Sequence, residues 1–395
     1  MSKSFFSSSS LKFKTTIVFL FVAASLGLTL RLIQGGAIPG HFKHIMHTHS
    51  HIALLGWLYN AGFIVVQYLI LKKKDGPLNS VFWISQLTFL GMLFSFPVQG
   101  YAFASIIFST LYLFCSYALV YYLFRYSKEI ENKAVSGLLK WSGVYLVLSS
   151  FGPFALGFIM AKGLNDTYWY KLSIYWFLHF LYNGFFALIV FAYLIQKLKS
   201  SVNQKAIYGL MAFSVIPLYG LSIVWLEPNW SLYLVSFVGA AFQVVAFWLL
   251  VKEPNLKNIF KNKVAKQLFG LALAAYLLKM VFQVFSVSPA VQTFLLETVS
   301  YSVIGFIHLV MLGFFTLFFL ALFMESEFLK MSSLLKVGLR LLVAGILLSE
   351  GLLFTQSVAV YWKVFQIPNF FIVLYWCSSL MPIGIGLIAI SLFKR

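Results

Sequence analysis

Five of the seven histidines in this chain gather in one stretch near its N-terminus. The segment 41–57 reads HFKHIMHTHSHIALLGW and contains His41, His44, His47, His49 and His51. The other two, His179 and His308, each lie deep inside an apolar run. Neutral imidazole is the commonest metal ligand, and an imidazole in hydrocarbon is costly unless it has a partner. A shared partner is therefore expected if folding brings these side chains to one depth.

The remainder of the chain is apolar enough to place them in a membrane. Of 395 residues, 61% are hydrophobic and 10% are charged, and the mean hydropathy is +0.90, outside the range of soluble domains. About 20 apolar residues cross the hydrocarbon, and twelve such runs recur without the period-two alternation of barrel strands. We expect an all-α membrane protein, a bundle of about twelve transmembrane helices. The expected spans are 15–34, 47–71, 81–98, 101–124, 138–161, 172–196, 206–226, 231–251, 267–288, 295–323, 333–354 and 368–393.

Basic residues set the expected orientation. The net charge is +19, yet most Lys and Arg residues fall in the connections on one side, which the positive-inside rule assigns to the cytoplasm together with both termini. The basic residues on the other side are Arg31, Lys43, Lys162, Lys171 and Lys363. This asymmetry accounts for the charge without a nucleic-acid partner. Short connections and no duplicated halves predict one transmembrane domain over 1–395.

The predicted depths of the helix-borne histidines agree. At about 1.5 Å per helical residue, His179 lies about 12 Å from the outer end of its run. His308 lies about 16 Å from Glu297, and His49 and His51 lie about 8–10 Å below the start of theirs. All therefore fall in the outer half of the bilayer, on three different helices. Two opposed histidines suffice for a six-coordinate, low-spin b-type haem, whose role is electron transfer.

The first ligand can be either of two residues on the second expected helix. At 100° per residue, His44, His47 and His51 share one face and His49 lies on the opposite face. The His49 face continues with Ala53, Gly56 and Asn60, and the His51 face with Leu55 and Leu58. Small residues suit a helix that lies against a porphyrin, which favours His49 and keeps His51 as the alternative. The His44, His47 and His51 face is then left for a second metal such as copper, for haem propionates, or for water.

These histidine-bearing helices resemble those of subunit I of the haem-copper oxidases, particularly the nitric-oxide reductase and cbb-type branch. In that family twelve helices carry low-spin haem ligands on helices 2 and 10 and a non-haem metal histidine on helix 6. Helix 10 of the family has a histidine pair, of which Phe306-Ile307-His308 keeps only the second. The expected seventh helix, 206–226, has none of the family's two histidines.

Helix 6 carries the branch-level resemblance. Trp176, His179, Asn183 and Gly184 are similar to the helix 6 pattern of the nitric-oxide reductases, with asparagine in place of glutamate. The stretch HTHSHIALLGW is also similar to the HxHxxLLGW opening of short oxidase-like haem proteins, which would favour His51.

The resemblance implies a membrane redox protein. A low-spin haem b would lie between His49 or His51 and His308, with His179 as an altered ligand for copper or non-haem iron and His44 and His47 as further metal candidates. The implied functions are electron transfer and the reduction or sensing of O2 or NO, with cytochrome c or a quinol as electron donor. The implied location is a bacterial inner membrane, which the chain would cross many times.

Charged residues inside or near the spans are further candidates. Arg31 lies close in depth to the histidines, where a guanidinium can pair with a haem propionate. Lys279 with Gln283, and Glu297 and Glu350 near expected outer helix ends, are costly in lipid and fit a polar pathway or propionate partners. Interfacial or snorkelling side chains are the alternative interpretation.

Two other function classes remain open from sequence. A twelve-helix secondary transporter fits the number of spans, although 72–80 reads KKKDGPLNS and lacks a basic DRxGRR-like signature. A factor that handles metal or haem would use the outer histidine cluster as its acceptor site.

Overall fold

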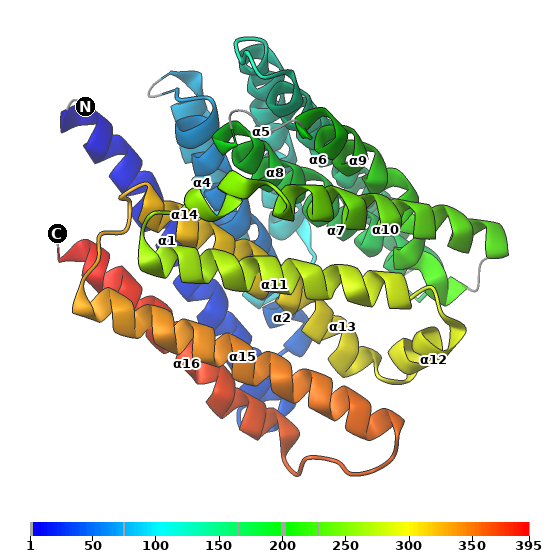
Figure 1. The fold of residues 1–395 in the computed structure, drawn as a ribbon. Helices are drawn as coiled ribbons and strands as arrows, with labels where there is room; N and C mark the ends of the chain where they lie inside the picture. The colour runs from blue at the N-terminus through cyan, green and yellow to red at the C-terminus, as the bar shows by residue number, and fades with distance from the viewer. Residues whose placement is uncertain (1–2, 74–75, 165, 199–202, 227–228, 395) are drawn as a thin grey trace.

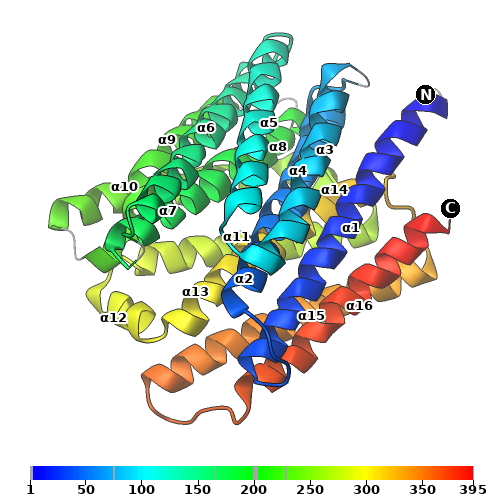
Figure 2. The same ribbon diagram turned by 180° about the vertical axis from the view of Figure 1, so that it is seen from behind.

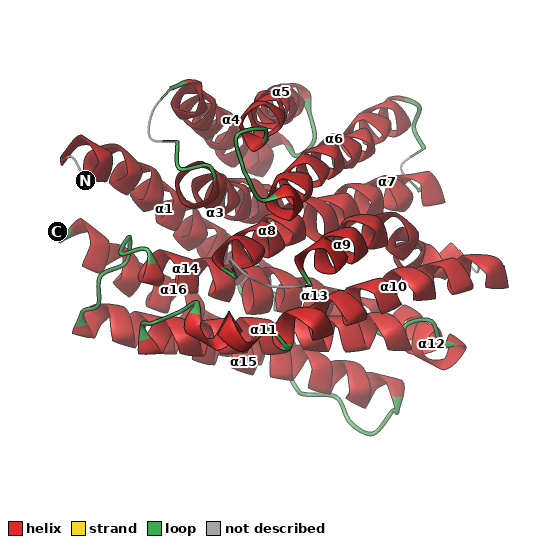
Figure 3. Cartoon of the chain, turned by 45° about the horizontal axis from the view of Figure 1, so that its top comes forward, coloured by secondary structure: helices red, strands yellow, loops and turns green. Residues whose placement is uncertain are grey.

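The computed structural model describes residues 3–73, 76–164, 166–198, 203–226 and 229–394, and within these ranges the chain is helical with no strand (Figures 1 and 3). Twelve helical stretches are long and apolar enough to cross a membrane. The two termini lie at the same end of the bundle (Figures 1 and 2), as an even number of crossings requires. Three basic residues that we assign to the cytoplasmic side, Lys74, Lys199 and Arg395, lie outside the described ranges.

The twelve spans divide into three successive groups of four. The first group consists of α1 (Lys3–Gln34), a second span made of α2 (Phe42–His51), η1 (Ile52–Tyr59), α3 (Asn60–Ile64) and η2 (Val65–Ile70), then α4 (Pro77–Gln99) and α5 (Phe103–Ser127). The second group consists of α6 (Lys133–Ala161), a sixth span made of α7 (Tyr168–His179), η3 (Phe180–Phe186) and α8 (Ala187–Lys197), then α9 (Gln204–Leu218) with η4 (Tyr219–Leu226), and α10 (Trp230–Val251). After the short η5 (Pro254–Asn258), the third group consists of α11 (Lys263–Phe285), α12 (Pro289–Glu297), a tenth span made of α13 (Val299–His308), η6 (Leu309–Thr316) and α14 (Leu317–Glu325), then α15 (Ser333–Tyr361) and α16 (Phe370–Phe393).

The second span of each group forms the centre of the molecule. In the second, sixth and tenth spans, 89%, 94% and 78% of the apolar window is buried, against 28–44% in the other nine. These three spans carry every histidine that lies within a membrane crossing. The outer nine spans shield them, so the histidines are positioned by helices that face protein rather than lipid.

The three central spans share a backbone irregularity. A π-helical segment begins directly after His51, His179 and His308, in η1, η3 and η6 respectively. In each span a glycine follows five residues after the histidine and an aromatic residue follows the glycine, so that the motif is H-x4-G-aromatic. The motif residues are His51, Gly56 and Trp57; His179, Gly184 and Phe185; and His308, Gly313 and Phe314. Because π segments are rare and occur mostly at functional sites, their recurrence marks these three positions as equivalent.

The third group closes the bundle against the first. The helices α15 and α16 cross at Gly338 and Gly384, where a Cβ on either glycine would lie 2.5–2.6 Å from the other's carbonyl oxygen. The helix α16 also packs along α1 (Figures 1 and 2). The first and last spans of the chain are therefore neighbours.

The predicted spans match the observed ones in number, with one break and with several helices that extend beyond their predicted ends. The expected helix 295–323 is interrupted at Thr298, whose φ of −114° and ψ of 17° are not helical. Glu297 consequently ends α12, where it is exposed, and the tenth span starts at Val299. Glu297 is therefore near the outer end of the tenth span, as expected, but lies two residues before it on a separate helix. Hydropathy did not reveal the break, because it registers apolar length and not a local change of backbone direction.

The eleventh span is longer than predicted. It continues to Tyr361, so Glu350 lies about 16 Å from its outer end, well inside the membrane crossing. The predicted span ended at 354, and Thr355, Gln356 and Ser357 follow it in the sequence. Two of them are satisfied internally, since Ser357 donates to the carbonyl of Leu353 and Gln356 accepts from the backbone N–H of Ile367.

Candidate functional site

The motif histidine of each central span contacts the third span of its own group. The contacts are His51 with Phe96 of α4, His179 with Val215 of α9, and His308 with Glu350 of α15. This regularity divides the bundle into three sectors. We name them after their polar residues: the His49–His308 sector, the His51–Tyr101 sector and the His179–Lys279 sector.

In the His49–His308 sector, His49 turns toward α1. Its Nδ1 donates to the carbonyl oxygen of Ala23 at 2.9 Å, so Nε2 is the unprotonated nitrogen, and the described residues offer Nε2 no hydrogen-bond partner. A Cβ at position 27 would lie 3.0 Å from the His49 Cε1 atom. The glycine at that position therefore allows the imidazole to lie against the helix.

On the tenth span of the same sector, His308 meets an acidic side chain. Its Nδ1 lies 3.5 Å from the Glu350 Oε1, and the side chain keeps 22% of its surface exposed although it lies within the tenth span. Both Glu350 carboxylate oxygens are buried without a hydrogen-bond partner. Arg31, only 8% exposed, donates to the Gln34 Oε1 at 3.2 Å and lies within electrostatic range of Glu350, His308 and His49.

In the His51–Tyr101 sector, both imidazole nitrogens of His51 are engaged. Nδ1 donates to the carbonyl of His47 at 2.8 Å and Nε2 lies 3.1 Å from the Tyr101 hydroxyl. Burial, with a smaller contribution from Tyr170, raises the pKa of the Tyr101 phenol above its ordinary value, so Tyr101 stays protonated and donates to Nε2. His51 also packs on the Phe96 ring, with centroids 4.5 Å apart.

The outer histidines lie at the mouth of this sector. The Nδ1 of His44 donates to the carbonyl of Pro97 at 3.3 Å, and its ring stacks on His41. Gly100, at a φ of +62°, leaves room for His44, because a Cβ there would lie 2.7 Å from the His44 ring. Within the described ranges, no three His, Cys, Asp or Glu side chains form a group able to hold a metal ion. His44 and His47, predicted as further metal candidates, are thus brought near His51 but not into a ligand cluster.

In the His179–Lys279 sector, His179 is fully engaged. Its Nε2 donates to the carbonyl of Val215 at 2.8 Å. Its Nδ1 lies 3.2 Å from the Asn183 Nδ2 and 3.3 Å from the Ser222 Oγ, which donate to it. His179 is only 1% exposed.

The same asparagine holds a buried lysine. The Lys279 ammonium donates to the Asn183 Oδ1 and to the Gln243 Oε1, each at 2.7 Å, and lies 5.1 Å from the centre of the Tyr276 ring. Gln283, one helical turn further along α11, is buried with an unbonded Oε1. Sequence reasoning missed Gln243, although a lone amide within the apolar run 231–251 is a detectable signal.

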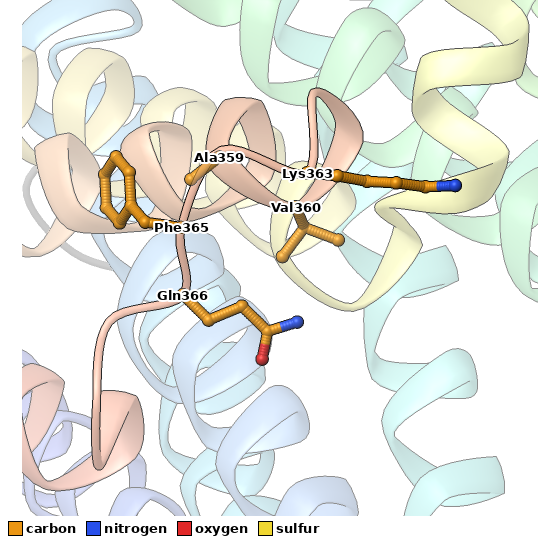
Figure 4. A pocket seen from close by; sticks show the side chains of 5 residues that line it. All are labelled: Ala359, Val360, Lys363, Phe365 and Gln366. Carbon is orange, nitrogen blue, oxygen red and sulfur yellow. The ribbon is translucent and has the colours of Figure 1, made fainter.

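The surface groove of the structure lies elsewhere. A cavity of about 220 Å³ opens where α15 ends, lined by Ala359, Val360, Lys363, Phe365 and Gln366 (Figure 4). A second cavity of about 370 Å³ shares two of these residues. No histidine lines either one, so this groove is separate from the three sectors.

Comparisons with known proteins reveal the fold. No family model matches the chain, and no curated protein matches it in sequence. Among solved structures, the chain is similar to a haem-copper terminal oxidase dimer determined by cryo-electron microscopy, with a TM-score of 0.67 and 14% identity over 100% of this chain and 84% of that chain. The predicted fold class, an all-α membrane protein of twelve spans like oxidase subunit I, is confirmed.

Proposed function

We propose that this chain binds one low-spin b-type haem in the His49–His308 sector and transfers electrons within the membrane. The observation that carries the proposal is the state of the imidazole nitrogens. Six histidines predicted as ligands lie within the central spans. Apart from His44 and His47 at the mouth of the His51–Tyr101 sector they are four, of which His51 and His179 have both nitrogens engaged. His49 and His308 keep Nε2 without a protein partner, and the two rings lie within electrostatic range of each other.

The chemistry of the surrounding groups supports a haem. The Ala23 carbonyl fixes the proton of His49 on Nδ1, which orients Nε2 as the metal ligand. Glu350 faces the Nδ1 of His308 and can do the same on the other side. Carboxylate and carbonyl partners of this kind are the usual support of metal-bound histidines.

Arg31 supplies a positive charge that can pair with the negative charge of a haem propionate. Its guanidinium lies in the same sector, and its only hydrogen-bond partner in the described part of the chain is the neutral Gln34. A guanidinium can bind a propionate through two parallel hydrogen bonds. We assign Arg31 this role.

Haem, when bound between two histidines, supplies a one-electron iron couple. The residues of the sector would then hold the haem, keep the proton on the Nδ1 atom of each histidine and exclude lipid. We propose a cytochrome c or a quinol as electron donor, a bacterial inner membrane as the location, and a single domain over 1–395. We also propose that the chain is related to the nitric-oxide reductase and cbb-type branch. The support for this is the helix 6 pattern that begins at Trp176.

The test is a reduced-minus-oxidised visible spectrum of the purified full-length protein. We expect a low-spin b-type signal that His308→Ala abolishes. His179→Ala is the matched control, since it removes an equivalent motif histidine whose nitrogens are already engaged, and it should keep the signal. A colourless wild type, or an unchanged spectrum in His308→Ala, would rule the proposal out, and the first result would favour transport.

Carbon monoxide distinguishes electron transfer from gas chemistry. Two histidines that both held the iron would leave it no open position for a gas, so CO added to the reduced protein should leave the spectrum unchanged. A spectral shift on CO addition would contradict two-histidine ligation and would support reduction or sensing of O2 or NO.

A further inference from the structure

Lys279 lies at the centre of the bundle, where an ammonium group needs strong partners. It is 1% exposed and projects from α11 between the sixth span and α10. Its two hydrogen bonds end on amide oxygens at 2.7 Å each, a distance typical of charge-assisted bonds. The Tyr276 ring, 5.1 Å away, provides a further favourable contact for a cation.

The lysine also determines the state of His179. Because Asn183 gives its Oδ1 to the ammonium, its Nδ2 must face His179 and donate to Nδ1. The Val215 carbonyl accepts from Nε2, which therefore carries the proton. Neither nitrogen keeps a lone pair free for a metal.

The central spans also differ at a second equivalent position, the one two residues before the motif histidine. There, the second span carries His49 and the tenth span carries Phe306. Of the three central spans, only the second has an imidazole at this position, since the sixth span carries Phe177 there. The polar groups of the His179–Lys279 sector converge on a side-chain cation instead.

An amide-held lysine also occurs at the opposite end of the molecule. Lys12 of α1 is fully buried and donates to the Gln67 Oε1 at 2.9 Å and to the Asn79 Oδ1. No histidine takes part there. The chain therefore uses buried ammonium groups with amide partners as fixed links between spans.

We infer that the Lys279 ammonium is the resident cation of the His179–Lys279 sector and takes the place of a second metal ion there. Copper or non-haem iron would have to displace two hydrogen bonds of His179 and approach a positive charge at close range. His179 is therefore a positioning residue for Asn183 and Lys279, and the protein carries no metal centre beside its proposed haem.

Elemental analysis of the purified full-length protein tests this inference. Copper, total iron and haem are measured separately, before and after incubation with Cu²⁺ or Fe²⁺ and removal of the excess. We expect no copper and no iron beyond the haem in the wild type, and the same result in His179→Gln. Because haem is counted independently, a protein that proved to lack haem would leave this test intact.

Two variants make the role of the ammonium visible. Lys279→Met should lower the thermal unfolding temperature, and the triple variant Lys279→Met, Asn183→Leu, Gln243→Leu should recover most of the loss, because the unpaired amides are then removed as well. About one equivalent of copper or non-haem iron in the wild type, lost in His179→Gln, would overturn the inference. An unchanged unfolding temperature in Lys279→Met would overturn it too.

Discussion

The His49–His308 and His179–Lys279 sectors are built on equivalent spans. They differ in whether the polar side chains have hydrogen-bond partners within the protein. His308 and His179 occupy the same position of the repeated motif, each followed by a π segment. His308 faces a carboxylate with unbonded oxygens, whereas His179 faces a carbonyl and an amide that engage both of its nitrogens. The fold therefore supplies the position, and residues on neighbouring spans decide whether a ligand can bind.

The largest effect on haem binding should come from replacing, one at a time, the two candidate ligands of the second span. His49→Ala should abolish the haem signal, because its Nε2 has no protein partner and is the nitrogen proposed to hold the iron. His51→Ala, only two residues away, should keep the signal, since His51 is engaged by His47 and Tyr101. Visible spectra of the two variants decide between them, and the reverse pattern would make His51 the ligand.

The next effect concerns stability and the buried lysine. Lys279→Met leaves the Oδ1 of Asn183 and the Oε1 of Gln243 without a donor. Since a buried unsatisfied polar group costs about 1–3 kcal/mol, we expect a loss of about 2–4 kcal/mol in the free energy of unfolding. Denaturation in detergent measures it, with Lys263→Met at the start of α11 as a control near zero.

In the His49–His308 sector, a smaller loss of stability should follow from removing the buried carboxylate. Glu350 is buried within electrostatic range of the buried Arg31, so Glu350→Leu removes the countercharge of that guanidinium and should destabilise the haem-free protein by about 1–2 kcal/mol. The exposed Glu297 provides the control, and Glu297→Leu should stay within about 0.5 kcal/mol of the wild type. A stabilised Glu350→Leu protein would show that the carboxylate does not compensate the charge of Arg31 in the absence of haem.

The smallest effect should come from the contact between α1 and His49. In Gly27→Ala the new Cβ lies 3.0 Å from the His49 ring and must displace it by a few tenths of an ångström. We expect a weaker haem affinity, by about tenfold or less. Gly270→Ala, where nothing lies within 4 Å of the new Cβ, is the matched control and should bind haem like the wild type.

Sequence reasoning was sufficient for local properties. Span length and apolarity are local, so the twelve crossings were predicted to within a few residues apart from the break at Thr298 and the ends of a few helices. The opposite directions of His49 and His51 were also predictable, because 42–51 is a regular α-helix with 100° per residue. The role of either residue as a haem ligand stays a prediction.

The regular helical wheel failed beyond His51. The π segment η1 uses i→i+5 hydrogen bonds, so faces drawn at 100° per residue no longer hold. Gly56 still packs against Phe19 of α1, but Asn60 turns to Gln86 of α4. The small face predicted to continue from His49 is therefore shorter than expected.

Long-range partners were out of reach for a different physical reason. Lys279 was singled out for its cost in lipid, yet its partners lie 96 and 36 residues away in the chain. Only the packing of three spans brings them together. The depth of Glu350 was missed because its helix extends past polar residues that are satisfied internally.

The closure of the bundle by α1 and α16 has a consequence for biogenesis. The walls around His49 and His308 come from the first two spans and from the last three, which a ribosome delivers at opposite ends of translation. Until α15 and α16 have entered the bilayer, Arg31 and His49 have no counterpart across from them. The proposed haem could therefore be inserted only after these last spans have joined the bundle, and a nascent chain halted before α13 would hold Arg31 and His49 without Glu350 and His308.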